Sequence, residues 1–258
     1  MAVTPQAIQL SRTGVAAHIV LNRPPLNILD LPSLRELNTV LASLPAPPAV
    51  RHLVFSGAGV RAFSAGVDVK DHLSDRVAEM LETFHRVFRT LWASEWISVA
   101  AVRGHCLGGG MELATFCDFV LAADTAQFAQ PEIKLGSFPP VAAVTLPVLV
   151  GSKRALDLLL TGRTLSAAEA HAVGLVTRVV PEAELEAATQ HLLGELNQLS
   201  PAVQALTKKA LWRAQGFDFE RRLKLSEEIY LNSLMKTHDA QEGLQAFLEK
   251  RPPVWEGR

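Results

Sequence analysis

RGHCLGGGMEL, at residues 103–113, is the stretch that indicates the fold most clearly. A strand-like run at residues 98–102 leads into three consecutive glycines, and a helix-compatible stretch follows them. Consecutive glycines let a ligand approach the backbone closely. The first turn of a helix presents free N–H groups and the positive end of the helix dipole. We therefore expect a strand–turn–helix unit whose N–H groups can bind an anion or a developing oxyanion.

A carboxylate follows this glycine run at a spacing that matters. Glu112 lies three residues after Gly109, so both return to roughly the same face of the expected helix. The alternative is a helix that packs closely against a sheet, with Glu112 as a favourable charge at its N-terminus. The run contains neither GxGxxG nor GK[ST], which excludes a dinucleotide-binding turn and a P-loop.

Two further segments combine small residues with possible chemistry. In RAFSAGVDVK, residues 61–70, small residues surround Gly66, and Ser64 is not part of a GxSxG motif. In QFAQPEIKLG, residues 127–136, Glu132 follows a proline in an apolar stretch, where burial would raise its pKa and suit it to general acid or base catalysis. Taken singly, the first segment is also compatible with a surface loop, and Glu132 with an exposed or ion-paired carboxylate.

Outward from these segments, short β-branched runs alternate with helical patterns, which is typical of an α/β fold. We expect strands at residues 17–21, 52–56, 98–102, 119–122 and 175–179, and helices at residues 32–44 and 74–93. Capping-box spacing predicts a helix start at Ser166 with Glu169, ending before Gly174, and another start at Asp239 with Glu242. The alternation stops near residue 199. We therefore predict an α/β core at residues 1–199 and a helical region at residues 200–258.

The composition limits the partners and the location of the protein. The 258 residues have a formal net charge of −1 and are 48% hydrophobic, so we expect neither a nucleic-acid nor a membrane partner. The longest apolar stretch, at residues 141–150, contains Pro147 and is too short to span a bilayer. Cys106 and Cys117 form no disulfide framework, no histidine cluster has metal-ligand spacing, and residues 1–14 show no targeting pattern. These features predict a cytoplasmic protein without a metal.

Together and in this order, the three segments resemble the enoyl-CoA hydratase/isomerase, or crotonase, superfamily. The resemblance extends along nearly the whole chain, from NRP at residues 22–24 to AFLEKR at residues 246–251. It implies a core of repeated ββα units in a spiral, and a C-terminal helical region that forms trimers, or hexamers made of two trimers. It also implies an acyl-CoA substrate whose coenzyme A is part of the substrate, with no separate cofactor.

The resemblance assigns roles to four residues. The backbone N–H groups of Val67 and Gly109 would form the oxyanion hole, Glu112 would act mainly on water, and Glu132 mainly in proton transfer. Family hydratases have both glutamates, so the pair favours a lyase that hydrates an α,β-unsaturated acyl-CoA. Double-bond isomerisation or other enolate chemistry remains an alternative within the family. An RNA-binding role, known for some proteins of this fold, is the alternative from another class.

The resemblance also implies contacts with coenzyme A and with the acyl group. The residues expected along coenzyme A are Pro25, Leu26, Ala62, Ala65, Gly66 and Asp68, with Lys250 reaching the phosphates. Many straight-chain hydratases have a glycine-rich stretch where this chain has SFPPVAA at residues 137–143. Together with RPPLNIL at residues 23–29, this segment resembles the branch that hydrates cyclic dienoyl-CoA thioesters. Proline and larger side chains at residues 137–143 would also reshape and narrow the acyl end of the pocket. We therefore expect a preference for a cyclic, planar acyl group.

Overall fold

Two β-sheets organise the computed structural model, which describes residues 6–73 and 75–258. The larger sheet has six strands, in the spatial order β1 (Ile8–Thr13), β2 (Ala16–Leu21), β3 (His52–Gly57), β5 (Ile97–Val102), β7 (Phe119–Ala123) and β10 (Arg178–Val180). The smaller sheet has four, in the order β4 (Ala62–Ser64), β6 (His105–Leu107), β8 (Gln127–Ala129) and β9 (Leu165–Ser166). Only the pairs β1–β2 and β8–β9 are antiparallel.

The chain alternates between the two sheets. β3 lies in the large sheet, β4 in the small one, and helix α2 (Val77–Ala93) follows. The same order returns as β5, β6 and α3 (Gly109–Phe116), and again as β7, β8 and α4 (Pro140–Val150), with the short helix η2 (Pro131–Leu135) preceding α4. This repetition is the expected ββα spiral, and the α/β prediction is confirmed.

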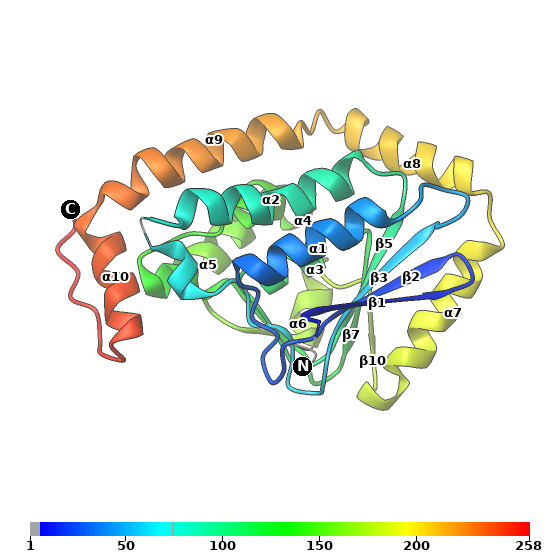
Figure 1. Cartoon of the computed structure of the whole chain (residues 1–258), viewed down its shortest axis with the longest axis horizontal. Helices are drawn as coiled ribbons and strands as arrows, with labels where there is room; N and C mark the ends of the chain where they lie inside the picture. Colours follow the sequence, from blue (N-terminus) through cyan, green and yellow to red (C-terminus); the bar gives the residue numbers. More distant parts are fainter. Residues whose placement is uncertain (1–5, 74) are drawn as a thin grey trace, which may run out of the picture.

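Helices cover both faces of the large sheet (Figure 1). On one face, α1 (Leu31–Ser43) and α2 bury apolar stripes in the main core. On the other, α7 (Leu185–Asn197) packs Leu185 and Leu192 on Val54, Val99 and Leu121. The remaining short elements are η1 (Val69–His72), α5 (Ser152–Thr161), α6 (Ala167–Ala172) and η3 (Glu182–Glu184). No helix within residues 6–73 and 75–258 has the length and apolar content to cross a membrane.

Most sequence-based element predictions agree with the structure, and three differ; the third, the cap at Asp239 and Glu242, is described below. The helix predicted at residues 74–93 begins at Val77, and Ser74 lies outside the described residues. The strand predicted at residues 175–179 lies later, as β10, because Leu175 and Val176 pack into the core before the strand begins. The capping box at Ser166 and Glu169 starts α6 as predicted.

Four helical elements follow residue 199: α8 (Pro201–Ala214), α9 (Phe219–Asn232), η4 (Leu234–Lys236) and α10 (His238–Leu248). Figure 1 shows α8 and α9 running along one edge of the molecule, with α10 at the far end. α9 packs on α4 and buries Phe219, Leu223 and Tyr230, whereas α8 has no buried residue. The helical region therefore meets the core mainly through α9 and α10.

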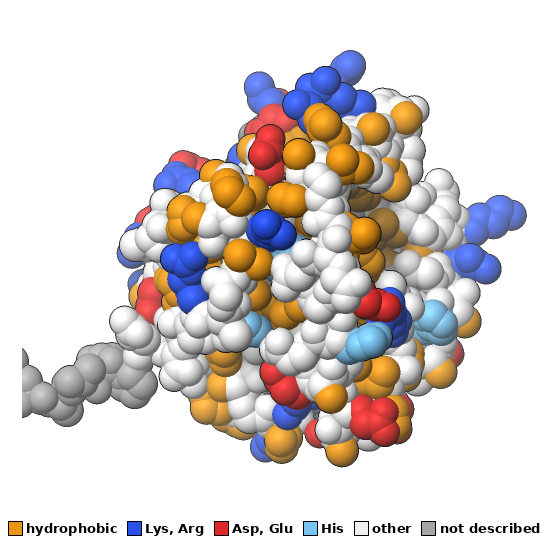
Figure 2. All heavy atoms as spheres, turned by 90° about the vertical axis from the view of Figure 1, so that its right-hand side faces the viewer, with side chains coloured by type: hydrophobic (Ala, Val, Ile, Leu, Met, Phe, Trp, Pro, Cys, Tyr) orange, Lys and Arg blue, Asp and Glu red, His pale blue; other side chains and the backbone are white. Residues whose placement is uncertain are grey.

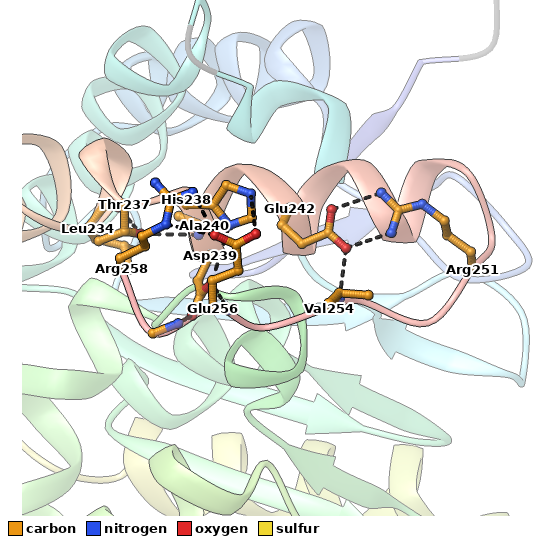
Figure 3. Close-up of polar contacts among 11 residues, drawn as sticks. Leu234, Thr237, His238, Asp239, Ala240, Glu242, Arg251, Val254, Glu256 and Arg258 are labelled. Atoms are coloured by element: carbon orange, nitrogen blue, oxygen red, sulfur yellow. Dashed lines mark hydrogen bonds and ion pairs between the residues drawn. The ribbon is translucent and has the colours of Figure 1, made fainter.

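The predicted cap at Asp239 and Glu242 is wrong. Thr237 caps α10 by accepting a hydrogen bond from the N–H of Ala240. The two acidic side chains instead bind the end of the chain, which folds back along the helix (Figure 3). Glu242 accepts two hydrogen bonds from Arg251 and one from the N–H of Val254, while Asp239 accepts from the N–H groups of residues 256 and 257. We call residues 249–258 the C-terminal strap.

Candidate active site

Three loops meet at one edge of the small sheet. β4, β6 and β8 are parallel neighbours, so their carboxyl ends lie side by side. The loop after β4 contains Gly66 and Val67, the loop after β6 contains Gly108 and Gly109, and the loop after β8 leads to Glu132. The topology therefore brings together the three segments that the sequence singled out.

Two backbone N–H groups face a common space between the first two loops. Among the described residues, neither the Val67 N–H nor the Gly109 N–H donates a hydrogen bond to another protein group. A Cβ added to Gly66, where φ is +96°, would lie 3.1 Å from the Gly109 nitrogen, and the Val67 side chain lies 3.0 Å from a Cβ built on Gly109. Because two free donors stand so close at a helix N-terminus, they can stabilise one developing oxyanion.

Glu112 lies one turn into α3, with only 3% of its surface exposed. Its Oε1 accepts a hydrogen bond from the N–H of Ala142, the third residue of α4, at 2.8 Å. Burial raises the pKa of Glu112 to about 7, although hydrogen bonds from Ala142 and Val141 favour its charged form. The carboxyl group is therefore able to take up and release a proton near neutral pH.

Glu132 lies across the glycine run from Glu112. A Cβ added to Gly108, where φ is +52°, would lie 2.7 Å from Glu132 Oε1, so only glycine leaves room for this carboxyl group. Burial raises the pKa of Glu132 well above its ordinary value, and the charge of Glu112 acts in the same direction. The Gln130 side chain is buried beside this carboxyl group, and its amide nitrogen would lie 3.2 Å from Oε2 with the amide turned to donate to Glu132.

A cavity of about 450 Å³ contains both carboxyl groups and both N–H donors. Phe138, Pro139 and Pro140 form part of its wall, so the segment that departs from the glycine-rich pattern lines the same cavity as the carboxyl groups. α9 closes the cavity with Tyr230, whose hydroxyl lies 2.8 Å from Ser137 Oγ. Burial raises the pKa of Tyr230 to about 12, and the charges of Glu132 and Glu112 add to the effect, so this hydroxyl stays protonated.

The residues predicted along coenzyme A are only partly brought to this cavity. Ala65 and Gly66 line it, whereas Pro25, Leu26, Ala62 and Asp68 do not. Ala62 is fully buried in β4 and its carbonyl accepts a hydrogen bond from the Asn27 amide, so its side chain is not available to a ligand. Asp68 caps η1 by accepting from the N–H of Lys70. Lys250 is exposed after α10, where φ is +55°.

Sequence reasoning missed several polar residues of the cavity wall, among them Tyr230 and His85. Tyr230 was recognised only as part of the apolar rhythm of its helix, yet it is the only tyrosine of the chain. His85 lies on the apolar stripe of α2, four residues after Leu81 and beside Phe84, and all three line the cavity. A histidine on an otherwise apolar stripe was the available signal.

Comparisons with known proteins agree along the whole chain. A family model described as enoyl-CoA hydratase/isomerase matches residues 11–258. A cyclohexa-1,5-dienecarbonyl-CoA hydratase of Thauera aromatica is 36% identical over 257 residues, which cover 100% of this chain and 99% of the relative. A crotonyl-CoA hydratase of Syntrophomonas wolfei is 35% identical over 249 residues, 95% of each chain. A crystal structure of an enoyl-CoA hydratase from Mycobacterium avium subsp. paratuberculosis superposes with a TM-score of 0.86 at 29% identity and covers 96% of this chain and 98% of that one.

Proposed function

The chain belongs to the enoyl-CoA hydratase/isomerase family, and from this premise we propose that it is a lyase that adds water reversibly to an α,β-unsaturated acyl-CoA thioester. One observation supports this function above the others. Two carboxyl groups with raised pKa values share a cavity with two unpaired backbone N–H donors. Hydration needs all four groups, because a carbonyl must be polarised while one proton leaves water and another reaches carbon.

The backbone donors would act on the thioester carbonyl. When the oxygen of water bonds to C3, the electron pair of the C2=C3 bond moves toward C2 and the carbonyl oxygen, which becomes negatively charged. The N–H groups of Val67 and Gly109 would donate hydrogen bonds to this oxygen. Fixed donors at such a position contribute more to the transition state than to the ground state, and each is worth roughly 3–4 kcal/mol.

The two glutamates would divide the proton transfers. With its pKa of about 7, Glu112 is partly ionised at neutral pH and would accept a proton from the attacking water. Burial and the charge of Glu112 both raise the pKa of Glu132, which favours the protonated carboxyl group that would supply the proton that C2 receives. No redox step occurs and the atoms of water are all retained in the product, so the reaction needs no cofactor.

The two glutamates are tested together. We expect Glu112→Gln and Glu132→Gln each to remove most of the hydration activity toward crotonyl-CoA. The assay measures hydration as the decrease in absorbance of the conjugated thioester. Because the groups act as a unit, the double variant should lose little more than either single variant. Losses that multiply in the double variant would contradict the shared role. Full activity of Glu132→Gln would move the assignment toward isomerisation.

A cyclic, planar acyl group is the proposed preference. Phe138, Pro139 and Pro140 wall the cavity, and a rigid ring loses less conformational entropy on binding than an alkyl chain. The relative from Thauera aromatica, whose name specifies a cyclic dienoyl substrate, supports the same direction. Comparing kcat/KM for cyclohexa-1,5-dienecarbonyl-CoA and crotonyl-CoA on one preparation tests it, and a higher value for crotonyl-CoA would reject it.

We also propose that the protein forms a homotrimer, or a hexamer of two trimers, through the helical region at residues 200–258. α8 buries none of its residues, and an apolar groove of about 610 Å³ opens beside it, lined by Trp92, Leu149 and Phe217 among others. Figure 2 shows apolar side chains gathered on the upper part of the face that includes α8. Such surface is typical of an interface rather than of a solvated helix.

Two finer assignments accompany this proposal. Lys250 would reach the phosphates of coenzyme A, and Lys250→Ala should raise KM for crotonyl-CoA more than it lowers kcat.

A cytoplasmic location suits the thiols of Cys106 and Cys117, which are both free and buried.

A further inference from the structure

A histidine nitrogen without a partner belongs to the wall of the cavity. Four buried side-chain nitrogens lack a hydrogen-bond partner among the described residues, and of the residues that contain them only His85 lines this cavity. The unpaired atom is Nε2, and the His85 side chain has no exposed surface in the folded chain. A buried polar atom without a partner is costly, so its presence at a binding site indicates a ligand group that pairs with it.

The other ring nitrogen of His85 is fixed by a chain of charges outside the cavity. Nδ1 lies 2.6 Å from Glu227 Oε1 on α9, and Arg89 donates to both oxygens of Glu227, at 2.9 and 3.1 Å. Burial alone would raise the pKa of Glu227, but the hydrogen bonds from His85 and Arg89 lower it, so the carboxylate is charged. Burial also lowers the pKa of His85, which keeps the imidazole neutral.

This arrangement determines which nitrogen bears the proton. A charged carboxylate can only accept, so Nδ1 must donate its hydrogen to Glu227. A neutral imidazole has a single N–H, and Nε2 is therefore left as an acceptor. Since Nδ1 faces Glu227, which does not line the cavity, the opposite edge of the ring with Nε2 is the edge that remains for the cavity.

We propose that His85 selects acyl groups that present a hydroxyl group to its Nε2, so that the enzyme prefers hydroxylated acyl-CoA ligands to hydrocarbon ones of the same size. This inference rests on the proposed hydratase function. His85 is the residue that contacts the hydroxyl, while Glu227 and Arg89 are positioning residues that fix its tautomer. An acyl group that ends in a methyl would leave Nε2 unpaired inside a closed site, and sites built for a hydrogen bond discriminate strongly against such analogues.

The neighbouring polar groups support a polar end of the acyl pocket. Tyr230 lies one turn after Glu227 on α9, and its hydroxyl and that of Ser137 also line the cavity. His72 lines it too, with its Nδ1 3.0 Å from the carbonyl of Asp68. The unpaired Nε2 of His85 is the fully buried one, so pairing it with a ligand hydroxyl relieves the larger cost.

The test compares substrates that differ by one hydroxyl. The probes are 4-hydroxybut-2-enoyl-, 5-hydroxypent-2-enoyl- and 6-hydroxyhex-2-enoyl-CoA, each paired with the analogue in which a methyl replaces the hydroxyl. For the wild-type protein we expect kcat/KM to favour the hydroxylated member of at least one pair by roughly tenfold or more. His85→Leu should abolish that preference and hydrate the methyl analogues at least as well as the wild type. His191→Leu, an exposed change on α7, is the control and should behave as the wild type does.

The outcomes separate this inference from the proposed function. If all six thioesters are hydrated without a preference for hydroxyl in any pair, the role of His85 is rejected and the hydratase function stands. If the wild-type protein hydrates cyclohexa-1,5-dienecarbonyl-CoA but none of the six, the role of His85 is rejected as well. If it hydrates none of these seven thioesters, the proposed function itself fails. A direct reading is also possible, because ¹⁵N spectra distinguish a protonated from an unprotonated ring nitrogen. Nε2 protonated in the free protein would overturn the assignment, and so would an unchanged substrate preference in Glu227→Leu, which leaves Nδ1 without its acceptor.

Discussion

At Gly66, the absence of a side chain keeps the oxyanion donors accessible. A Cβ there would lie 3.0 Å from the carbonyl oxygen of Leu107 and 3.1 Å from the nitrogen of Gly109. The positive φ of +96° is also unfavourable for any residue with a side chain. Conformation and space therefore both require glycine at this position, immediately before the donor of Val67.

We expect Gly66→Ala to reduce kcat for crotonyl-CoA by roughly 100-fold or more, because loss of one oxyanion donor has an effect of this size. The matched control is Gly174→Ala. Gly174 has a similar φ of +89°, but the nearest atom to its added Cβ is 3.9 Å away and the residue does not line the cavity. The Gly174→Ala variant should be less stable because of backbone strain, but its kcat should equal that of the wild type. Equal kcat values in the two variants would show that Gly66 has no special part in the site.

Glu112 makes the stability of the protein depend on pH. Its pKa is raised from 4.5 to about 7, so the folded state holds the proton more tightly than the unfolded state does. The free energy of unfolding therefore falls as the pH rises from about 4.5 to 7, and the loss is complete above that range. The shift corresponds to about 3 kcal/mol.

Glu112→Gln should remove this penalty, because its amide oxygen can still accept the hydrogen bond from Ala142. We expect the melting temperature of the variant to exceed that of the wild type at pH 8, and the difference to shrink at pH 5. Glu228→Gln, a change of an exposed carboxylate on α9, should leave the melting temperature unaltered at both values. A constant difference across the pH range would refute the raised pKa.

Among the elements, α10 holds the short helix that contains Glu132. A Cβ added to Gly243 in α10 would lie 2.3 Å from the carbonyl oxygen of Leu135 in η2. Likewise, a Cβ on Gly136 would lie 2.5 Å from the carbonyl oxygen of Asp239. The C-terminal strap binds the opposite side chains of the same helix (Figure 3). α10 is therefore held between the C-terminal strap on one side and η2, the short helix that contains Glu132, on the other.

Gly243→Ala must move α10 away from η2, because the added Cβ cannot remain 2.3 Å from the carbonyl oxygen of Leu135. We expect a lower melting temperature and a kcat for crotonyl-CoA reduced at least tenfold, because small displacements of a proton donor are costly. Gly194→Ala in α7 is the control, as its added Cβ meets nothing within 4 Å. That change should raise the stability by roughly 0.5–1 kcal/mol through helix propensity and leave kcat alone. A variant of Gly243 with normal kcat would contradict this role of α10.

The elements that were predicted from the sequence differ in burial and length from the elements that were missed. β3 and β5 were predicted because their runs are buried on both faces and rich in apolar residues. β4, β6 and β8 have three residues each, too few for a period-two pattern, although the motifs around them were recognised. α4 was missed because it is apolar all round and contains Pro147, so it shows no stripe. The carboxylates and donors were found through the motifs. The part of Tyr230 in the cavity wall depends on the packing of α9, which no local pattern encodes, and the local signal for His85 was its place on an apolar stripe of α2.

For the whole molecule, α8 is the element whose environment in the single chain is incomplete. Val203, Leu206 and Leu211 are at least half exposed along it. We expect light scattering to give three times the mass of the chain or a multiple of it. Leu206→Glu should dissociate the assembly, because a charge would be buried in an apolar contact. Leu160→Glu, at an equally exposed position on α5, should not change the mass. A wild-type monomer at micromolar concentration would reject the trimer.

The difference between the backbone donors and the carboxyl groups affects how this protein can evolve. The donors of Val67 and Gly109 belong to the main chain, so at Val67 any amino acid except proline supplies the same N–H. The carboxyl groups belong to side chains, and a single nucleotide change can replace either glutamate. Mutations of the glutamates can therefore change the reaction, while the main-chain N–H groups continue to polarise the thioester carbonyl. A lineage that lost Glu132 would retain a polarised carbonyl, from which selection could build another reaction.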